Sequence, residues 1–233
     1  MKVAIMQPYF FPYIGYFQLM NNVDKFVVYD NIGYSRKGWI NRNRLLVNGK
    51  DAYFTIPLLK DSDYLDVNER YLAESWPNDR KKLLNRLIES YRKSPNFKEV
   101  YPLIEACLMI EERNLFRFLY NSLVLTREYL AIKTPLIVSS EIPIDHKLRA
   151  SNKVVAICKA LDAETYVNPI GGVELYDKQA FSNHNIELKF LRSANISYDQ
   201  FSHPHVPFLS IIDIMMFNAK ESLQSLLLSF SLE

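Results

Sequence analysis

The sequence predicts an α/β protein with a Rossmann-like, mostly parallel sheet, to which a β-hairpin and a helical insertion are added. Three observations carry this prediction: short continuous apolar runs separated by helical segments, an Asn-Gly pair between two extended runs, and a helical middle. Short apolar runs are typical of strands that are buried on both faces of a parallel sheet. We expect the 233 residues to form a single domain, 1–233, with a helical insertion at 78–132.

Five apolar runs are the expected strands: Val3–Met6, Phe26–Tyr29, Leu136–Ser139, Thr165–Val167 and Ile186–Leu191. The first two are linked by Gly15–Asn22, which is just long enough for a short crossover helix. The carboxyl ends of such strands lie at one edge of a sheet, where α/β proteins bind their ligands. The loops after these two strands are therefore the first candidates for a site.

A β-hairpin over 44–57 is the clearest local prediction, because Asn48-Gly49 tolerates the two positive φ angles of a type I′ turn. Helices are expected after it from Asn78 or Asp79 to about Arg92, and over Phe97–Ile110 and Asn114–Leu130. Pro102 predicts that the second of these is broken or shorter. Further helices are expected from Ser151 or Asn152 to Leu161, over Val173–Asp177 and over Ala219–Phe230.

The composition is that of an ordinary globular protein, with 48% hydrophobic and 23% charged residues. A net charge of +2 is too small to indicate non-specific binding to nucleic acid. Cys107 and Cys158 lie in apolar helical segments and are expected to be buried free thiols; no metal motif is present. We find neither a signal peptide nor an apolar run that could span a membrane, so we expect a cytoplasmic protein.

The loop after the first strand, residues 7–17, concentrates aromatic side chains and prolines. A loop that connects a buried strand to a helix can bind anions through free backbone N–H groups. Its Pro-x-x-Gly-Tyr order is similar to the HxGH loop of nucleotidyltransferases, but tyrosines stand where that motif needs cationic histidines. We therefore expect a binding loop in which Gln7, Tyr9, Tyr13 and Gly15 contact the ligand; core filling by the aromatic rings is the alternative.

The loop after the second strand, residues 35–44, is basic. Arg36, Arg42 and Arg44 offer planar forks that suit phosphate or carboxylate, and Trp39 can stack on a base or sugar ring. Asparagines alternate with the last two arginines, so the asparagines should share one face and the arginines the other. A solvated basic loop that the tryptophan anchors is the alternative.

Other positions are weaker candidates. Asp30 ends the second strand and can bind a hydroxyl, metal or amine, or cap the next turn. Gly171-Gly172, shortly before Tyr176, permits close approach of the backbone to a phosphate or sugar, although a plain turn also explains it. The only close pair of histidines is the His-Pro-His segment that begins at His203. His203 is the expected general base or substrate contact, with a plain loop as the alternative.

Several segments together resemble the WbqC-like family, whose members occur in bacterial O-antigen and polysaccharide gene clusters. They are QPYFFPYIGYF, Asp30, GWINRNRL, SYRKSPNF, SSEI, TYVNPIGGVELY, Tyr198-x-Gln200 and FLSIIDIMMFN, and they span nearly the whole chain. The opening and GWINRNR are the more specific motifs. Ala219 stands where a glycine is expected, which affects only a helix boundary. The resemblance implies a setting in cell-surface polysaccharide synthesis rather than a reaction.

The resulting hypothesis is a transferase that modifies a nucleotide-linked amino sugar by acyl or aminoacyl transfer from an activated donor. The arginines would clamp phosphates, the aromatic rings would stack on base or sugar, and Gln7, Asp30 and Asn41 would orient hydroxyl or amine groups. No covalent nucleophile is indicated, so positioning and one proton acceptor, Asp30 or His203, would suffice. The alternatives are a nucleotidyl or phosphoryl transferase and a non-catalytic nucleotide- or glycan-binding protein. The sequence identifies no cofactor.

Overall fold

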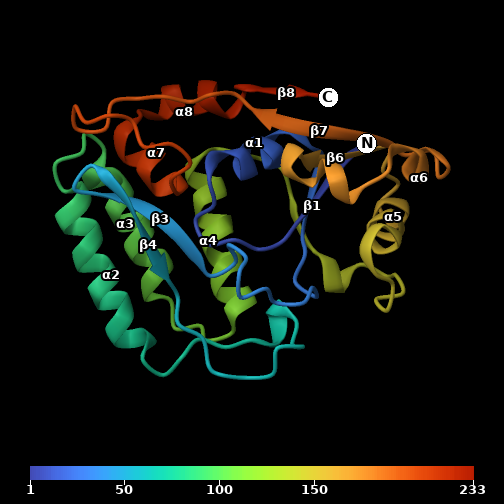
Figure 1. Ribbon diagram of the computed structural model, residues 1–233, viewed down its shortest axis with the longest axis horizontal. Helices are drawn as coiled ribbons and strands as arrows, with labels where there is room; N and C mark the ends of the chain where they lie inside the picture. Colours follow the sequence, from blue (N-terminus) through green and yellow to red (C-terminus); the bar gives the residue numbers. More distant parts are fainter.

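The computed structural model describes residues 1–233 and contains a six-stranded sheet in the order β5-β2-β1-β6-β7-β8. These strands are β1 (Lys2–Met6), β2 (Lys25–Val28), β5 (Leu136–Val138), β6 (Thr165–Pro169), β7 (Glu187–Ser193) and β8 (Phe230–Leu232). Neighbouring strands pair in parallel except β7 and β8, which are antiparallel. The predicted α/β class with a mostly parallel, Rossmann-like sheet is confirmed (Figure 1).

Helices pack on both faces of the sheet. They are α1 (Ile14–Asn22), α2 (Trp76–Tyr91), α3 (Phe97–Met109), α4 (Leu115–Tyr129), α5 (Ala150–Ala160), α6 (Lys178–Ser182), α7 (Ile211–Phe217) and α8 (Lys220–Leu227). One apolar cluster joins Ala4 of β1 to residues of α1 to α4, α7 and α8. A second cluster joins Val3 and Ile5 of β1 to residues of α5 and α6. Alternate side chains of β1 therefore enter two different cores, as the strand period requires.

The hairpin consists of β3 (Arg42–Val47) and β4 (Lys50–Thr55), which form a separate two-stranded sheet. Asn48 and Gly49 have φ angles of 51° and 74°, so the predicted turn with two positive φ angles is confirmed. Helices α2 to α4 follow the hairpin and precede β5 in the chain. Their apolar faces belong to the same cluster as one face of the sheet.

Several predicted boundaries are wrong. The first middle helix begins at Trp76 rather than at a cap on Asn78 or Asp79, because Pro77 lies in the first turn, where its missing N–H costs nothing. Pro102 lies inside α3 and does not break it. Only one intrahelical hydrogen bond is lost there, and the helix buries Val100 and Ile104 on its inner face.

Three elements near the C-terminal end also differ from the prediction. The expected helix to Phe230 ends at Leu227, and Phe230 pairs with Ser193 as part of β8. Pairing with a strand so distant in sequence cannot be read from helical periodicity. The expected helix over Val173–Asp177 is instead the 3₁₀ segment η3 (Ile170–Leu175), and the following α6 was not predicted. Two further 3₁₀ segments are η1 (Val67–Glu69) and η2 (Ser139–Glu141).

Candidate functional site

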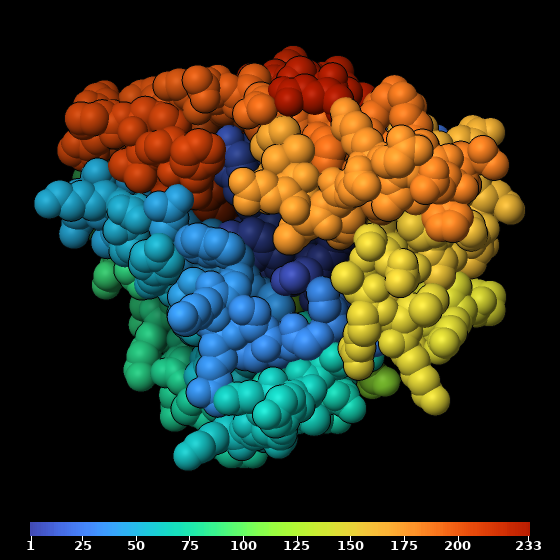
Figure 2. All heavy atoms as spheres, turned by 45° about the vertical axis from the view of Figure 1, so that its right-hand side comes forward, coloured from blue at the N-terminus to red at the C-terminus, as the bar shows by residue number.

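The main cleft lies at the carboxyl edge of the sheet, where β1 and β6 are neighbours. The chain continues from β1 to β2 on one side, while β6 and β7 lie on the other, so the loops after β1 and β6 diverge. Such a reversal of strand order opens a crevice in which α/β proteins bind their ligands. Figure 2 shows the hollow, with N-terminal residues in dark blue on its floor. The cleft thus lies at the edge of the sheet where the sequence predicts a site.

Two connected chambers make up the cleft. The larger has a volume of about 770 Å³ and is lined from the first loop, the end of β7 and the segment after it. The smaller has a volume of about 420 Å³ and is lined from both predicted loops and from η3. Met6, Tyr9, Tyr16 and Pro169 line both chambers, so the two chambers adjoin at these residues.

Most of the predicted binding residues lie in these chambers. Gln7, Tyr9, Trp39, Gly171, Gly172 and Tyr176 line the smaller chamber, and Tyr9, Tyr13 and Gly15 line the larger one. A Cβ atom at Gly172 would lie 2.0 Å from the Asn168 amide nitrogen, so any larger residue would displace this side chain. The side chain of Gln7 is exposed and forms no hydrogen bond within the protein, which leaves it free for a ligand.

Aromatic and basic side chains gather around Tyr9. We define this platform as Tyr9, Trp39, Arg42, Arg44 and Tyr53. The ring of Trp39 stacks on Tyr53 at 5.9 Å and lies 6.2 Å from Tyr9. The guanidinium carbons of Arg42 and Arg44 lie 5.2 Å and 5.8 Å from the centre of the Trp39 ring. Burial raises the pKa of the Tyr9 hydroxyl, although both arginines lower it. Tyr9 lines both chambers and Trp39 the smaller one, whereas Arg42, Arg44 and Tyr53 line neither. Positive charge and flat rings therefore meet beside Tyr9.

The two arginines differ in the hydrogen bonds and ion pairs that they form within the protein. Arg44 donates to the Asp51 carboxylate at 3.1 Å and to the Phe208 carbonyl at 2.9 Å. Arg42 donates to the Lys37 carbonyl at 2.6 Å and forms no ion pair. Arg42 is accordingly the cation with more capacity left for an anionic ligand.

Two residues of the basic loop are engaged elsewhere. Arg36 forms an ion pair with Asp63, in which both side chains are exposed. Asn41 is buried, donates to the Ile56 carbonyl at 2.7 Å and accepts from the Tyr34 hydroxyl at 2.8 Å. Neither lines a chamber. The asparagines are buried and the neighbouring arginines partly exposed, which is the alternation that the sequence predicts.

Asp30 is buried in a polar cluster outside the two chambers. Its carboxylate accepts hydrogen bonds from the Ser139 hydroxyl at 2.8 Å, the Ser140 hydroxyl at 2.7 Å and amide at 2.9 Å, and Asn68 at 2.8 Å. Burial raises the pKa of Asp30, but the hydrogen bonds from Ser140, Ser139 and Asn68 outweigh it, and the pKa is lowered. A carboxylate with four donors and a lowered pKa is a poor proton acceptor, and its contacts indicate a structural role.

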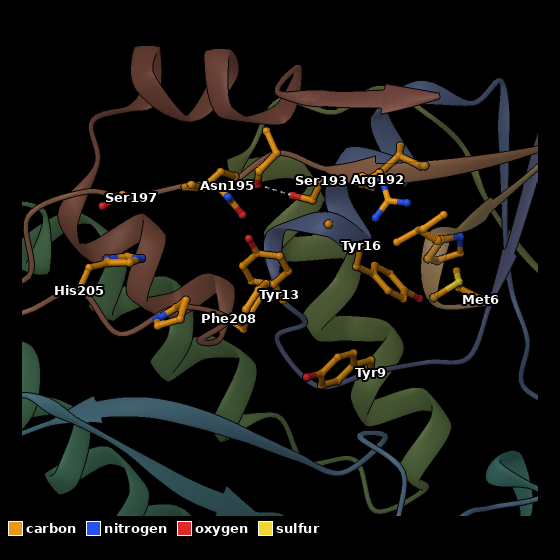
Figure 3. Close-up of a pocket in the computed structure, with 17 residues that line it drawn as sticks. Met6, Tyr9, Tyr13, Tyr16, Arg192, Ser193, Asn195, Ser197, His205 and Phe208 are labelled. Atoms are coloured by element: carbon orange, nitrogen blue, oxygen red, sulfur yellow. Dashed lines mark hydrogen bonds between the residues drawn. The ribbon is translucent and has the colours of Figure 1, made fainter. Parts of the chain in front are cut away.

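The two histidines of the His-Pro-His segment lie in different places. His203 packs against the hairpin turn, where a Cβ on Gly49 would lie 3.2 Å from its ring. His205 lines the larger chamber, and its Nδ1 is buried without a hydrogen-bond partner. Figure 3 shows the His205 ring directed toward Tyr13. His205 is therefore the histidine that lines the cleft, whereas His203 lies outside both chambers, and the role expected of His203 stays a prediction.

Sequence reasoning also missed Tyr53 and the polar end of β7. Tyr53 completes the platform because it lies opposite Arg44 across the hairpin, a relation that the Asn-Gly turn would have predicted. Ser193, Asn195 and Ser197 line the larger chamber but belong to no recognisable motif. No group of three or more His, Cys, Asp or Glu side chains is arranged to hold a metal ion, and no helix is long and apolar enough to cross a membrane.

The fold and cleft define an α/β protein with a Rossmann-like sheet and a cleft at its switch point. The chain belongs to the WbqC-like protein family, whose model matches residues 7–225. It is similar to the uncharacterized protein Rv1507c of Mycobacterium tuberculosis (strain ATCC 25618 / H37Rv), with 27% identity over 220 residues, or 92% of each chain. No solved structure matches it.

Proposed function

We propose that this protein is a transferase of cell-surface polysaccharide synthesis that acylates the amino group of a nucleotide-linked sugar. The observation that carries the proposal is the platform around Tyr9, the platform residue that lines both chambers. A nucleotide sugar needs a flat surface for its base and cations for its diphosphate, and Trp39, Tyr53 and Arg42 supply both. The family membership supports the polysaccharide setting.

The amide of Gly15 adds a neutral anion-binding group. Tyr16 is the first residue of α1 whose amide is bonded, to the Tyr13 carbonyl at 3.0 Å. The amides of Ile14 and Gly15 have no acceptor, and Gly15 lines the larger chamber. Free N–H groups at the beginning of a helix favour negative charge.

The proposed reaction needs one proton acceptor and no covalent nucleophile. The sugar amine attacks the carbonyl carbon of an activated acyl donor, a new N–C bond forms, and the bond from that carbon to its leaving group breaks. The amine proton passes to the imidazole of His205, which lines the larger chamber, and then to the departing group. Positioning of the two substrates across the chambers supplies much of the remaining acceleration.

Arg42→Ala is expected to weaken binding of the cognate nucleotide sugar about tenfold or more, because a charge-assisted hydrogen bond contributes about 1.5–3 kcal/mol. Isothermal titration calorimetry with uridine-, guanosine- and thymidine-diphosphate sugars measures this. Arg117→Ala, which removes an exposed arginine of α4, is the control and should bind like the wild type. The proposal fails if no nucleotide sugar binds or if Arg42→Ala binds equally well.

His205→Asn is expected to lower kcat by about 10² or more and leave the affinity for the nucleotide sugar unchanged, as the loss of a proton acceptor predicts. The matched control is His203→Asn, which makes the same change at a histidine outside the chambers. A saturable ligand without turnover by the wild type, for any activated acyl donor, would instead indicate a non-catalytic binding protein.

A further inference from the structure

The larger chamber is apolar over most of its surface. Its walls include Met6, Ile170, Leu191, Ile196 and the rings of Tyr13 and Phe208. Phe208 is 61% exposed and packs edge-on against Tyr13 at 5.5 Å. Exposed rings beside an apolar cavity lose water-accessible surface when an apolar ligand enters, which favours binding.

Charge is almost absent from both chambers. Arg192 and His205 are the only residues with a cationic form that line the larger chamber, and no Asp or Glu lines either one. Arg192 is paired with Glu233, to which its two nitrogens donate at 2.5 Å and 3.2 Å. A ligand with an ammonium group would therefore find no carboxylate here, and burial of an unpaired charge is costly. This disfavours an aminoacyl donor with a free α-ammonium group.

Polar groups form a strip along one wall instead. Ser193, Asn195 and Ser197 follow one another beside the chamber mouth (Figure 3). The side chains of Asn195 and Ser197 form no hydrogen bond within the protein. Such neutral donors and acceptors suit amide groups in an extended linker.

From these observations we propose that the larger chamber binds the aliphatic acyl chain of a thioester donor, with the amide-bearing linker along the Ser193–Ser197 strip. This inference rests on acyl transfer as the proposed function and names the class of its donor. In the step that follows, the sugar nitrogen bonds to the acyl carbon, the C–S bond breaks, and the sulfur leaves as a thiol after it receives the amine proton.

Gly15 offers a way to fill the chamber. A Cβ at this position would lie 3.5 Å from the Tyr13 ring and 3.9 Å from the Ser193 Cβ, so a larger side chain enters the space between them. Gly15 lies in the first turn of α1 and has no positive φ. Leucine is therefore compatible with the backbone there.

The test measures the affinity of acetyl-, butanoyl-, hexanoyl- and octanoyl-coenzyme A by calorimetry. For the wild type, affinity should rise with chain length, by up to fourfold per methylene, the factor that corresponds to about 0.8 kcal/mol. Gly15→Leu should bind acetyl-coenzyme A within threefold of the wild type and lose the gain from longer chains. Gly33→Leu, at a glycine outside both chambers with open space around it, should keep that gain. Ser193→Leu fills the chamber from the opposite wall and replaces Gly15→Leu if that variant does not fold.

Equal affinity for all chain lengths, or no binding of any acyl-coenzyme A, would overturn the inference. So would an undiminished gain with chain length in the filled variant. The proposed function is judged separately, by binding of nucleotide sugars and by turnover with acyl phosphates or other activated donors. Failure of the proposed function can thus be distinguished from failure of the donor inference, because the nucleotide-sugar and turnover measurements do not depend on the chain-length series.

Discussion

Asp30 shows how neighbouring groups decide the role of a single carboxylate. At the end of β2, with an aromatic loop one strand away, it is a plausible acid or base from sequence alone. Ser139 and Ser140, which follow the adjacent strand β5, donate to it three times, and Asn68 donates once more. The carboxylate thus joins the ends of two strands to the η1 segment.

Asp30→Ala is expected to lower the free energy of unfolding by about 3 kcal/mol near pH 7, because it leaves several buried donors without an acceptor. The folded pKa lies below its ordinary value of 3.8, so the carboxylate stabilises the protein above that pH. The contribution is lost as the pH falls through the folded pKa. The difference between wild type and variant should therefore shrink at low pH in urea unfolding. Asp63→Ala, at an exposed carboxylate, should change stability by less than about 0.5 kcal/mol. An Asp30→Ala protein that is fully stable but inactive would contradict the structural role.

At the scale of elements, the hairpin and a buried hydrogen-bond network position the walls of the cleft. The hairpin brings Arg42, Arg44 and Tyr53 together. The segment before α7 is held by Asp213, which accepts from Tyr91 at 2.9 Å, Tyr198 at 2.6 Å and Gln200 at 2.6 Å. Tyr91 in turn accepts from the Leu46 amide at 2.8 Å. The buried network thus connects α2, α7, the hairpin and the loop that carries His205.

Gly49→Ala is expected to lower the free energy of unfolding by about 1–2 kcal/mol, because a left-handed backbone disfavours a side chain. The residue has a φ of 74°, and the added Cβ would also meet the His203 ring at 3.2 Å. Denaturant unfolding measures the change. The same substitution at Gly33, where φ is not positive and no atom lies within 4 Å, should be close to neutral. Equal stability of the two variants would show that the turn does not define the hairpin.

For the whole molecule, short sequence patterns predicted the fold class and the edge of the sheet at which the cleft lies. They did not predict the contacts between segments that are distant in the chain. The Asn48-Gly49 turn could be predicted because two adjacent residues determine it. The strand β8, the partners of Asp30 and the separation of His203 from His205 depend on segments that lie far apart in the chain. Periodicity and propensity carry no information about such register. The predicted residues on the first loop and the glycine junction line the cleft, since strand order alone places them there.

The binding of a nucleotide sugar on the platform can be followed through Trp39. The chain contains two tryptophans, Trp39 on the platform and Trp76 buried in α2. In a Trp76→Phe variant all tryptophan fluorescence comes from Trp39. We expect the cognate nucleotide sugar to quench this fluorescence saturably, at the concentration at which calorimetry detects binding. A ligand that binds by calorimetry and leaves the fluorescence of Trp39 unchanged would contradict it.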